Sequence, residues 1–288
     1  MAGFNGLGQY ATTVESGTSH YSTWRKTPSQ VTTAGVWFDT SMSPGNPNPQ
    51  YYAATPLIAQ QMKRSTDGGL NHGAAVTPLA KYLNRFLIMS GSATGLPMSY
   101  ILCDYLLYYP FVDTGTNDEQ FMDNTNTLPR YTDGVGVQMM AVSVASNSGT
   151  LPTYTVNYTN SDGVARRTSV VQRVNIATAN GSIITSSIGS AISSGAFIGL
   201  QQGDLGVRSV ESVTFPAVTD VGLFALVLVK PLITSVILEQ TAPSEVLPIA
   251  HQTVVPRIYD DAMLSLLTLP SGSLSGVAFH GEIETVWN

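Results

Sequence analysis

Residues 153–176, TYTVNYTNSDGVARRTSVVQRVNI, contain the clearest structural pattern in the chain. Tyr154, Val156 and Tyr158 alternate with polar residues, and this period of two is typical of a strand with one buried face. Asp162-Gly163 follows, and an Asp-Gly pair between two strand-like runs is a strong signal for a tight hairpin turn. The stretch therefore predicts an antiparallel β-hairpin.

Further strand signals lie on both sides of this hairpin. Residues 221–229 are apolar without alternation, which predicts a strand covered on both faces. At the end of the chain, Phe279 and Ile283 alternate with His280 and Glu282, which predicts a half-buried strand. Many short strands separated by turn signals predict a mainly β fold, with a β-sandwich or jelly-roll-like body over residues 98–288. The other candidate strands are 98–109, 135–144, 207–215 and 232–238.

Residues 55–97, in front of this body, carry two helix signals. Thr55-Pro56 precedes residues 57–64, and Thr77-Pro78 precedes residues 79–87. In both, Thr can cap the first turn and Pro suits the first helical position. The apolar residues of 79–87 also follow a helical spacing. We therefore predict a short helical region with two helices.

Residues 1–54 are predicted to form an extended N-terminal arm. The segment is rich in Gly, Thr, Ser and Asn, and the prolines within residues 44–49 exclude a helix. It nevertheless carries large aromatic side chains, which stabilise a protein only when they are buried. The arm is therefore expected to be ordered, either on its own body or on a neighbouring subunit. The candidate interface residues are Trp24, Trp37, Phe38, Tyr51 and Tyr52.

The composition favours a protein that contacts other proteins. Only 11% of the 288 residues are charged, and 43% are hydrophobic, so disorder does not explain the low charge. The net charge is −6, with an excess of basic residues in 1–90 and of acidic residues in the remainder. Nothing is basic enough to indicate a nucleic-acid surface.

Residue patterns for catalysis are absent from the sequence. The four histidines, His20, His72, His251 and His280, lack metal-ligand spacing, and Cys103 lies in an apolar run that predicts a buried hydrophobic side chain. Neither a P-loop, a G-x-G-x-x-G nor a G-x-S-x-G motif occurs. We therefore expect a protein that is not an enzyme and that has no cofactor and no metal.

Two clusters of acidic residues leave alternatives open. Oxygen-rich loops such as residues 113–133 can bind Ca²⁺, but the spacing of an EF-hand is missing, which favours a solvated acidic loop. Glycosidases need two carboxylates about 5 to 10 Å apart, so a virion glycosidase also stays possible. The carboxylates considered are Asp113, Asp118, Glu119, Asp123 and Asp133 for calcium, and Glu211, Asp220, Glu282 and Glu284 for glycosidase chemistry.

Targeting signals are not recognisable. Residues 1–10 lack the basic and apolar regions of a signal peptide. The longest uninterrupted apolar run, residues 223–229, is too short to span a bilayer. We expect assembly in a reducing cytoplasm and no membrane partner.

An aromatic, proline-punctuated arm, two short helices and a Thr/Ser/Val-rich β body together resemble the virion structural proteins of tailed bacteriophages. The resemblance is to head decoration (cement) and minor capsid proteins in particular. The segments that carry it are 36–45, VWFDTSMSPG, and 203–211, GDLGVRSVE.

This resemblance implies a protein that stabilises a phage capsid through subunit contacts. Its expected partners are the major capsid protein and copies of itself, as a homotrimer, with no nucleic acid. Its expected location is the virion capsid, after assembly in the host cytoplasm. The alternative is a tail or baseplate component, or a receptor-binding protein that recognises carbohydrate. A major capsid protein is disfavoured because no long charged helix is present.

Overall fold

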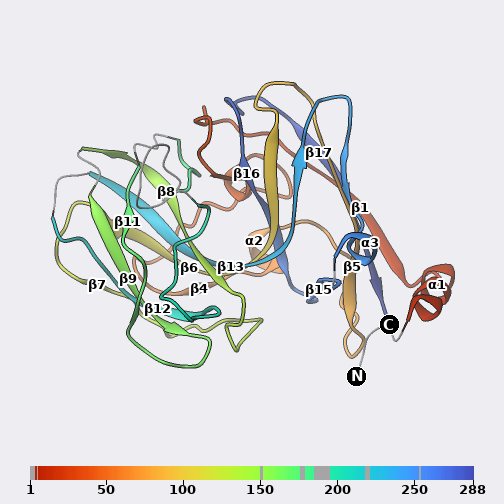
Figure 1. Ribbon diagram of the computed structural model, residues 1–288, viewed down its shortest axis with the longest axis horizontal. Coiled ribbons are helices and arrows are strands. Elements are labelled where there is room, and N and C mark those ends of the chain that lie inside the picture. The colour runs from red at the N-terminus through yellow and green to blue at the C-terminus, as the bar shows by residue number, and fades with distance from the viewer. Residues whose placement is uncertain are drawn as a thin grey trace.

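The computed structural model describes residues 4, 6–149, 152–175, 179–184, 195–217, 221–252 and 254–288. Within these residues the chain folds mainly into strands, which form three antiparallel sheets with a few short helices between them (Figure 1). The prediction of a mainly β, sandwich-like fold is confirmed.

The central sheet has the strand order β2-β16-β6-β13-β8, and β4 also pairs with β6. Its two longest strands, β6 and β13, pair antiparallel, with Met98 opposite Ile237 at one end and Asp113 opposite Leu223 at the other. Apolar residues 224–229 are buried on both faces of β13, as their lack of alternation predicts. The bounds are β2 (Phe38–Asp39), β4 (Gln60–Gln61), β6 (Met98–Asp113), β8 (Gln138–Ser148), β13 (Val221–Ile237) and β16 (Met263–Leu269).

The second sheet contains the predicted hairpin. Tyr154, Val156 and Tyr158 are fully buried and belong to the apolar cluster shared with β6, β12 and β13. The Gly163 amide donates to the carbonyl of Asn160 at 3.0 Å and closes the turn. The second arm of the hairpin is interrupted, because Val170 between its two pieces donates to Gly199 instead. The order is β10 (Arg167–Thr168), β9 (Thr153–Asn160), β12 (Val207–Thr214) and β7 (Gln120–Phe121), and β11 (Gln172–Arg173) also pairs with β9.

The third sheet joins the two ends of the chain. Strand β17 lies between β1 and β5, and its alternation of buried and partly exposed residues confirms the predicted half-buried strand. The order is β14 (Ser244–Val246), β5 (Lys81–Ser90), β17 (Phe279–Trp287), β1 (Ser19–Lys26) and β3 (Gly45–Asn46), and β15 (Arg257–Ile258) also pairs with β5.

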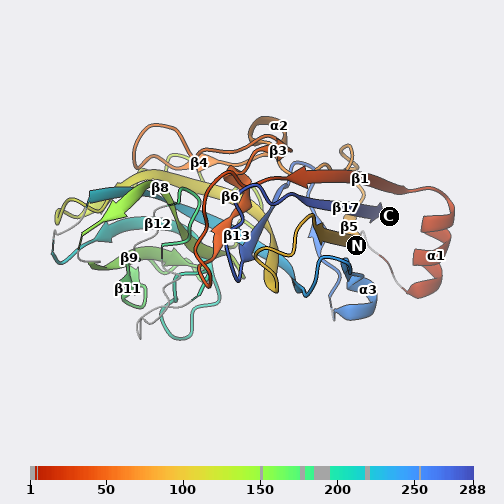
Figure 2. The same ribbon diagram turned by 90° about the horizontal axis from the view of Figure 1, so that it is seen from above.

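The second and third sheets lie at opposite ends of the molecule, and β6 and β13 run between them (Figures 1 and 2). Strand β6 contributes side chains to the cluster at each end, with Tyr109 among the second-sheet residues and Tyr100 among the third-sheet residues. A third cluster covers the remaining central-sheet residues and includes Tyr52 and Tyr105. The long central sheet is therefore the common support of both ends.

Both helix predictions in residues 55–97 are wrong, because strands lie where the two helices were predicted. Residues 81–90 form β5, because pairing with β17 and β14 places Leu83 and Phe86 in the core, and tertiary pairing outweighs helical spacing. After Pro56, Leu57 has a φ of 61°, and Gln60–Gln61 pairs with β6. The short helices are α1 (Leu7–Glu15), η1 (Thr40–Met42), α2 (Arg64–Asp67) and α3 (Pro248–His251).

The chain does not fold as three separate regions with boundaries at residues 54 and 97, as predicted, because one sheet contains strands from all three regions. The third sheet takes β1 and β3 from residues 1–54, β5 from 55–97, and β17 from 98–288. Residues 19–26 are therefore a strand of the folded body, with β17 on one side and β3 on the other.

Candidate functional site

The five aromatic residues proposed as interface anchors differ in how far their own chain buries them. Trp24, Phe38 and Tyr52 are buried, with at most 4% of each side chain exposed, so they belong to the core of this chain. Trp37 is partly buried against the core. Tyr51 alone is a large exposed aromatic among the five, at 57%. The anchor hypothesis therefore fails for Trp24, Phe38 and Tyr52, because their own chain already covers them.

A buried polar network fixes the segment that carries these aromatics. The Tyr52 hydroxyl donates to Asp39 Oδ2 at 2.5 Å, and the Tyr105 hydroxyl of β6 donates to Asp39 Oδ1 at 2.7 Å. Burial raises the pKa of Asp39, while these hydrogen bonds act in the opposite direction. The network ties residues 39–52 to the central sheet.

Lys26 secures the same segment from the third sheet. Its ammonium group donates to the carbonyl of Ser43 at 3.0 Å and approaches those of Ser41 and Asn48 at 3.4 Å. The side chain is 2% exposed, and burial lowers the pKa of Lys26 to about 8. This buried cation is therefore used within the fold.

The remaining candidates for chemistry are dispersed. His72 is buried, and burial lowers its pKa to about 3, with the Lys81 ammonium 3.4 Å from its Nδ1 atom. Cys103 is fully buried, and burial raises the pKa of its thiol. Over the described ranges, no three His, Cys, Asp or Glu side chains are placed to hold a metal ion.

Asp113 and Asp123, considered for calcium binding, form hydrogen bonds within their own loop, and the described carboxylates considered for glycosidase chemistry lie in two different sheets. Asp113 and Asp123 accept hydrogen bonds from backbone amides two residues ahead, at 2.7 and 2.8 Å. Glu211 lies on β12 in the second sheet, whereas Glu282 lies on β17 in the third. Asp220 falls outside the described residues.

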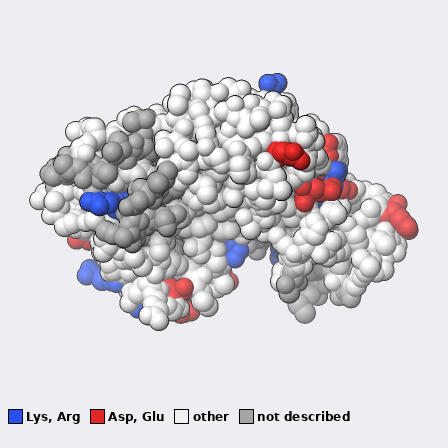
Figure 3. Space-filling view, turned by 45° about the horizontal axis from the view of Figure 1, so that its top comes forward, with Lys and Arg blue, Asp and Glu red and all other residues white. Residues whose placement is uncertain are grey.

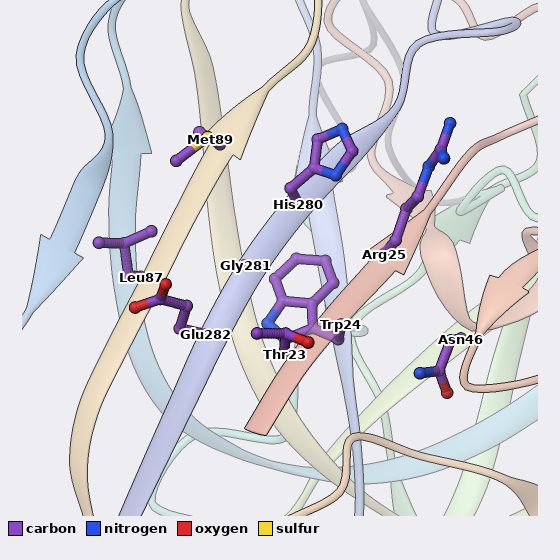
Figure 4. Close-up of a pocket in the computed structure, with 9 residues that line it drawn as sticks. All are labelled: Thr23, Trp24, Arg25, Asn46, Leu87, Met89, His280, Gly281 and Glu282. Carbon is purple, nitrogen blue, oxygen red and sulfur yellow. The ribbon is translucent and has the colours of Figure 1, made fainter. Parts of the chain in front are cut away.

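The outer face of the third sheet holds a depression of about 330 Å³ (Figure 4). Cross-strand pairing sets its lining, because Arg25 of β1 lies opposite His280 of β17, and Thr23 lies opposite Glu282. On the other side of β17, His280 lies opposite Met89 of β5. The full lining is Thr23, Trp24, Arg25, Asn46, Leu87, Met89, His280, Gly281 and Glu282.

Gly281 is required at the base of this depression. A Cβ atom there would lie 2.2 Å from the Trp24 ring, so only glycine lets the indole lie across β17. The indole in turn stacks on Phe86, with ring centroids 5.8 Å apart. A glycine inside an alternating strand is the sequence signal for such a close approach.

The depression has two electrostatically different sides. On one side, Arg85 Nη1 lies 3.0 Å from Glu282 and Arg85 Nε also contacts Glu245, so this arginine is shared between two carboxylates. A hydrogen bond with Glu282 raises the pKa of Tyr21 on the same face. On the other side, the exposed Arg25 has no ion pair with any described residue. Arg25 is therefore a cation without an ion-pair partner on one side of the depression, whereas the other side has two carboxylates for one arginine.

Arg25, Asn46 and Thr23 are surface-site residues that no sequence pattern predicts. The prediction that His280 and Glu282 lie on the polar face of a strand is confirmed. Arg25 joins them only because β1 pairs with β17.

A second concave surface is apolar. It is a groove of about 430 Å³ at the ends of β6, β13 and β16, with no charged side chain in its lining. Leu238 is 69% exposed there and Val236 is 37% exposed. The other lining residues are Gly35, Pro97, Ser99, Leu269, Pro270 and Ser271.

Comparisons with known proteins found no protein-family profile and no curated protein that matches this chain. One solved structure, described as the structure of infectious bursal disease virus Gx strain, is 8% identical over 94% of this chain and 81% of that chain, with a TM-score of 0.16. A TM-score of that size does not support a shared fold. Among the described residues, no helix is long and apolar enough to cross a bilayer.

Proposed function

We propose that this chain is a structural protein of a bacteriophage virion, which binds and stabilises the capsid through contacts between subunits. The observation that carries the proposal is a broad surface almost free of charged groups (Figure 3). Only 11% of the residues are charged, and five of them, Lys26, Asp39, Lys81, Asp104 and Arg130, are buried in the fold. Most of the face drawn in Figure 3 is therefore made of uncharged polar and apolar groups, and the exposed charges lie in a few places on it.

Such a surface suits permanent contact with other proteins. Charged residues are depleted at the cores of protein interfaces, where they would lose hydration. Exposed apolar side chains in concave regions, such as Leu238 in the apolar groove, gain stability only when a partner covers them. The expected partners are the major capsid protein and further copies of this chain, arranged as a homotrimer in a decoration or cement role.

A binding assay on capsids tests this function. Purified protein is added to capsids that lack it, and bound protein and capsid melting temperature are measured. We expect saturable binding in a fixed ratio to capsid subunits, with a rise in melting temperature. Leu238→Asp should weaken binding, whereas Val254→Asp, at an equally exposed residue outside the groove lining, should not. Absence of binding by the unaltered protein would refute the role.

One observation favours the alternative of a carbohydrate-binding tail or receptor-binding component. A polar recess of about 410 Å³ lies between residues 46–50 and α2, and its lining includes the planar polar groups of Asn46, Asn48, Gln50 and Arg64. Groups of this kind can hydrogen-bond sugar hydroxyls. Binding to an array of bacterial surface glycans, together with only a few copies per virion, would favour this alternative over the capsid role.

A further inference from the structure

Two complementary surface features lie at opposite ends of this molecule. The depression with Arg25 and His280 is on the third sheet, and strand β7 is on the second sheet. Figure 1 shows these sheets at the two ends of the long axis, with the central sheet between them. The two features therefore cannot contact each other within one copy of the chain.

The feature at the β7 end is an acidic loop with an exposed aromatic ring. Phe121 lies on β7, the edge strand of the second sheet, and 66% of its surface is exposed. Asp118, Glu119 and Asp123 flank it and are exposed, and none of them forms an ion pair with a described residue. This tip combines an unburied apolar group with several uncompensated negative charges.

The depression offers the matching chemistry. Leu87 and Met89 supply an apolar wall, and the exposed Arg25 supplies a positive charge without an ion-pair partner in the described structure. Glu282 also lines the depression, but its carboxylate pairs with Arg85. His280 and Asn46 add hydrogen-bonding groups beside Arg25. A volume of about 330 Å³ is at the lower end of the range for ligand pockets and is large enough to admit a single side chain of a protein partner.

We propose that copies of this chain associate head to tail, with Phe121 of one copy seated in the depression of the next and Asp118 paired with Arg25. The proposal rests on the proposed role as a subunit-packing protein and specifies one of its contacts. A heterologous contact of this kind closes into a ring when the rotation between copies allows it. A ring of three copies is the arrangement that a homotrimer requires.

Charge reversal and rescue test the contact in the purified full-length chain. Sedimentation velocity over a concentration series measures association of the unaltered protein, Arg25→Glu, Asp118→Arg and the double variant. We expect each single variant to weaken association by about tenfold or more, because a like-charge pair replaces an attractive one. The double variant should recover most of the loss, since it restores opposite charges in reversed positions.

Two further variants separate this contact from general effects of charge and stability. Arg166→Glu reverses an exposed arginine in the second sheet's hairpin, outside the depression, and should associate like the unaltered protein. Phe121→Ser should weaken association while its thermal melt stays near that of the unaltered protein, because the ring is mostly exposed.

The outcomes distinguish this inference from the proposed function. A chain that stays monomeric at all concentrations but still binds capsids overturns the head-to-tail contact and leaves the capsid role standing. Equal association of Arg25→Glu and Arg166→Glu also overturns it. Loss of capsid binding by Arg25→Glu with unchanged self-association would place a different protein in the depression, again against the inference.

Discussion

The carboxylate of Asp104 and the guanidinium of Arg130 form a buried, bidentate ion pair, with Oδ1–Nη2 and Oδ2–Nε distances of 2.7 and 2.9 Å. Arg130 Nη2 also donates to the carbonyls of Met62 and Tyr105, and the Met263 amide donates to Asp104. Burial raises the pKa of Asp104, and Arg130 counteracts this effect. Residues from four separate segments therefore depend on one pair.

Arg130→Met should destabilise the protein by about 3–5 kcal/mol, because it leaves the Asp104 carboxylate buried without its cation. Urea unfolding followed by circular dichroism measures the change. The double variant Asp104→Asn with Arg130→Met should be more stable than Arg130→Met alone, since the orphan charge is gone. A loss below about 1 kcal/mol for Arg130→Met would contradict a structural role for the pair.

Lys26 should make stability depend on alkaline pH. Its folded pKa of about 8 lies below the ordinary value of 10.5, so the unfolded chain binds more protons between these pH values. The free energy of unfolding therefore rises as pH increases from about 8 to 10.5. Below pH 8 the buried charge of Lys26 destabilises the fold to its full extent. The full effect is on the order of 3 kcal/mol, from the size of the shift.

The comparison with Lys26→Met isolates this effect, because other groups titrate equally in both proteins. The difference in free energy of unfolding between the unaltered protein and Lys26→Met should move in favour of the unaltered protein between pH 7.5 and pH 9.5. A constant difference over that range would show that Lys26 is not desolvated in solution.

Gly281→Ala should destabilise the third sheet by about 1–3 kcal/mol, because the added Cβ meets the Trp24 ring at 2.2 Å and the indole must move. Gly8→Ala in α1 is the matched control: its Cβ meets nothing within 4 Å, and alanine favours a helix. Thermal melts of both variants check the prediction. Equal melting temperatures would mean that Trp24 does not lie against Gly281.

Asp204 should contribute stability that is lost in acid. Its carboxylate accepts hydrogen bonds from Arg167, Tyr158 and Asn160, and the Arg167 hydrogen bond lowers its pKa to about 2. The folded pKa lies below the ordinary 3.8, so the contribution is present above pH 4 and disappears as pH falls through 2. Asp204→Asn should therefore unfold more easily than the unaltered protein at pH 6.

Acid denaturation completes this test. The difference between Asp204→Asn and the unaltered protein should shrink between pH 4 and pH 2, since protonation removes the charge in the latter. Amide exchange of residues 199–206 should be faster in the variant at pH 6, because Asp204 anchors this segment to β9. A difference independent of pH would assign the loss to packing and not to charge.

Local patterns predicted strands well where alternation was clean. Tyr154, Val156 and Tyr158 are buried together, and Phe279 and Ile283 face the core as expected. The helix prediction failed for Lys81–Ser90, because Leu83, Phe86 and Leu87 satisfy the spacing of a helix although the segment is a strand that buries Leu83, Phe86 and Ile88 in the core. Local spacing cannot choose between them when the deciding contacts come from β17, almost 200 residues away.

What the sequence by itself determined is the chemical character of the protein: low charge, many apolar residues, strands with defined buried faces, and no recognisable catalytic motif. What only the tertiary structure decided is which of those faces meet. Trp24, a proposed surface anchor, lies in the core because β1 pairs with β17, and the same pairing brings Arg25 beside His280. The physical reason is that side-chain alternation is a property of neighbouring residues, whereas hydrogen bonds between strands join segments from any part of the chain.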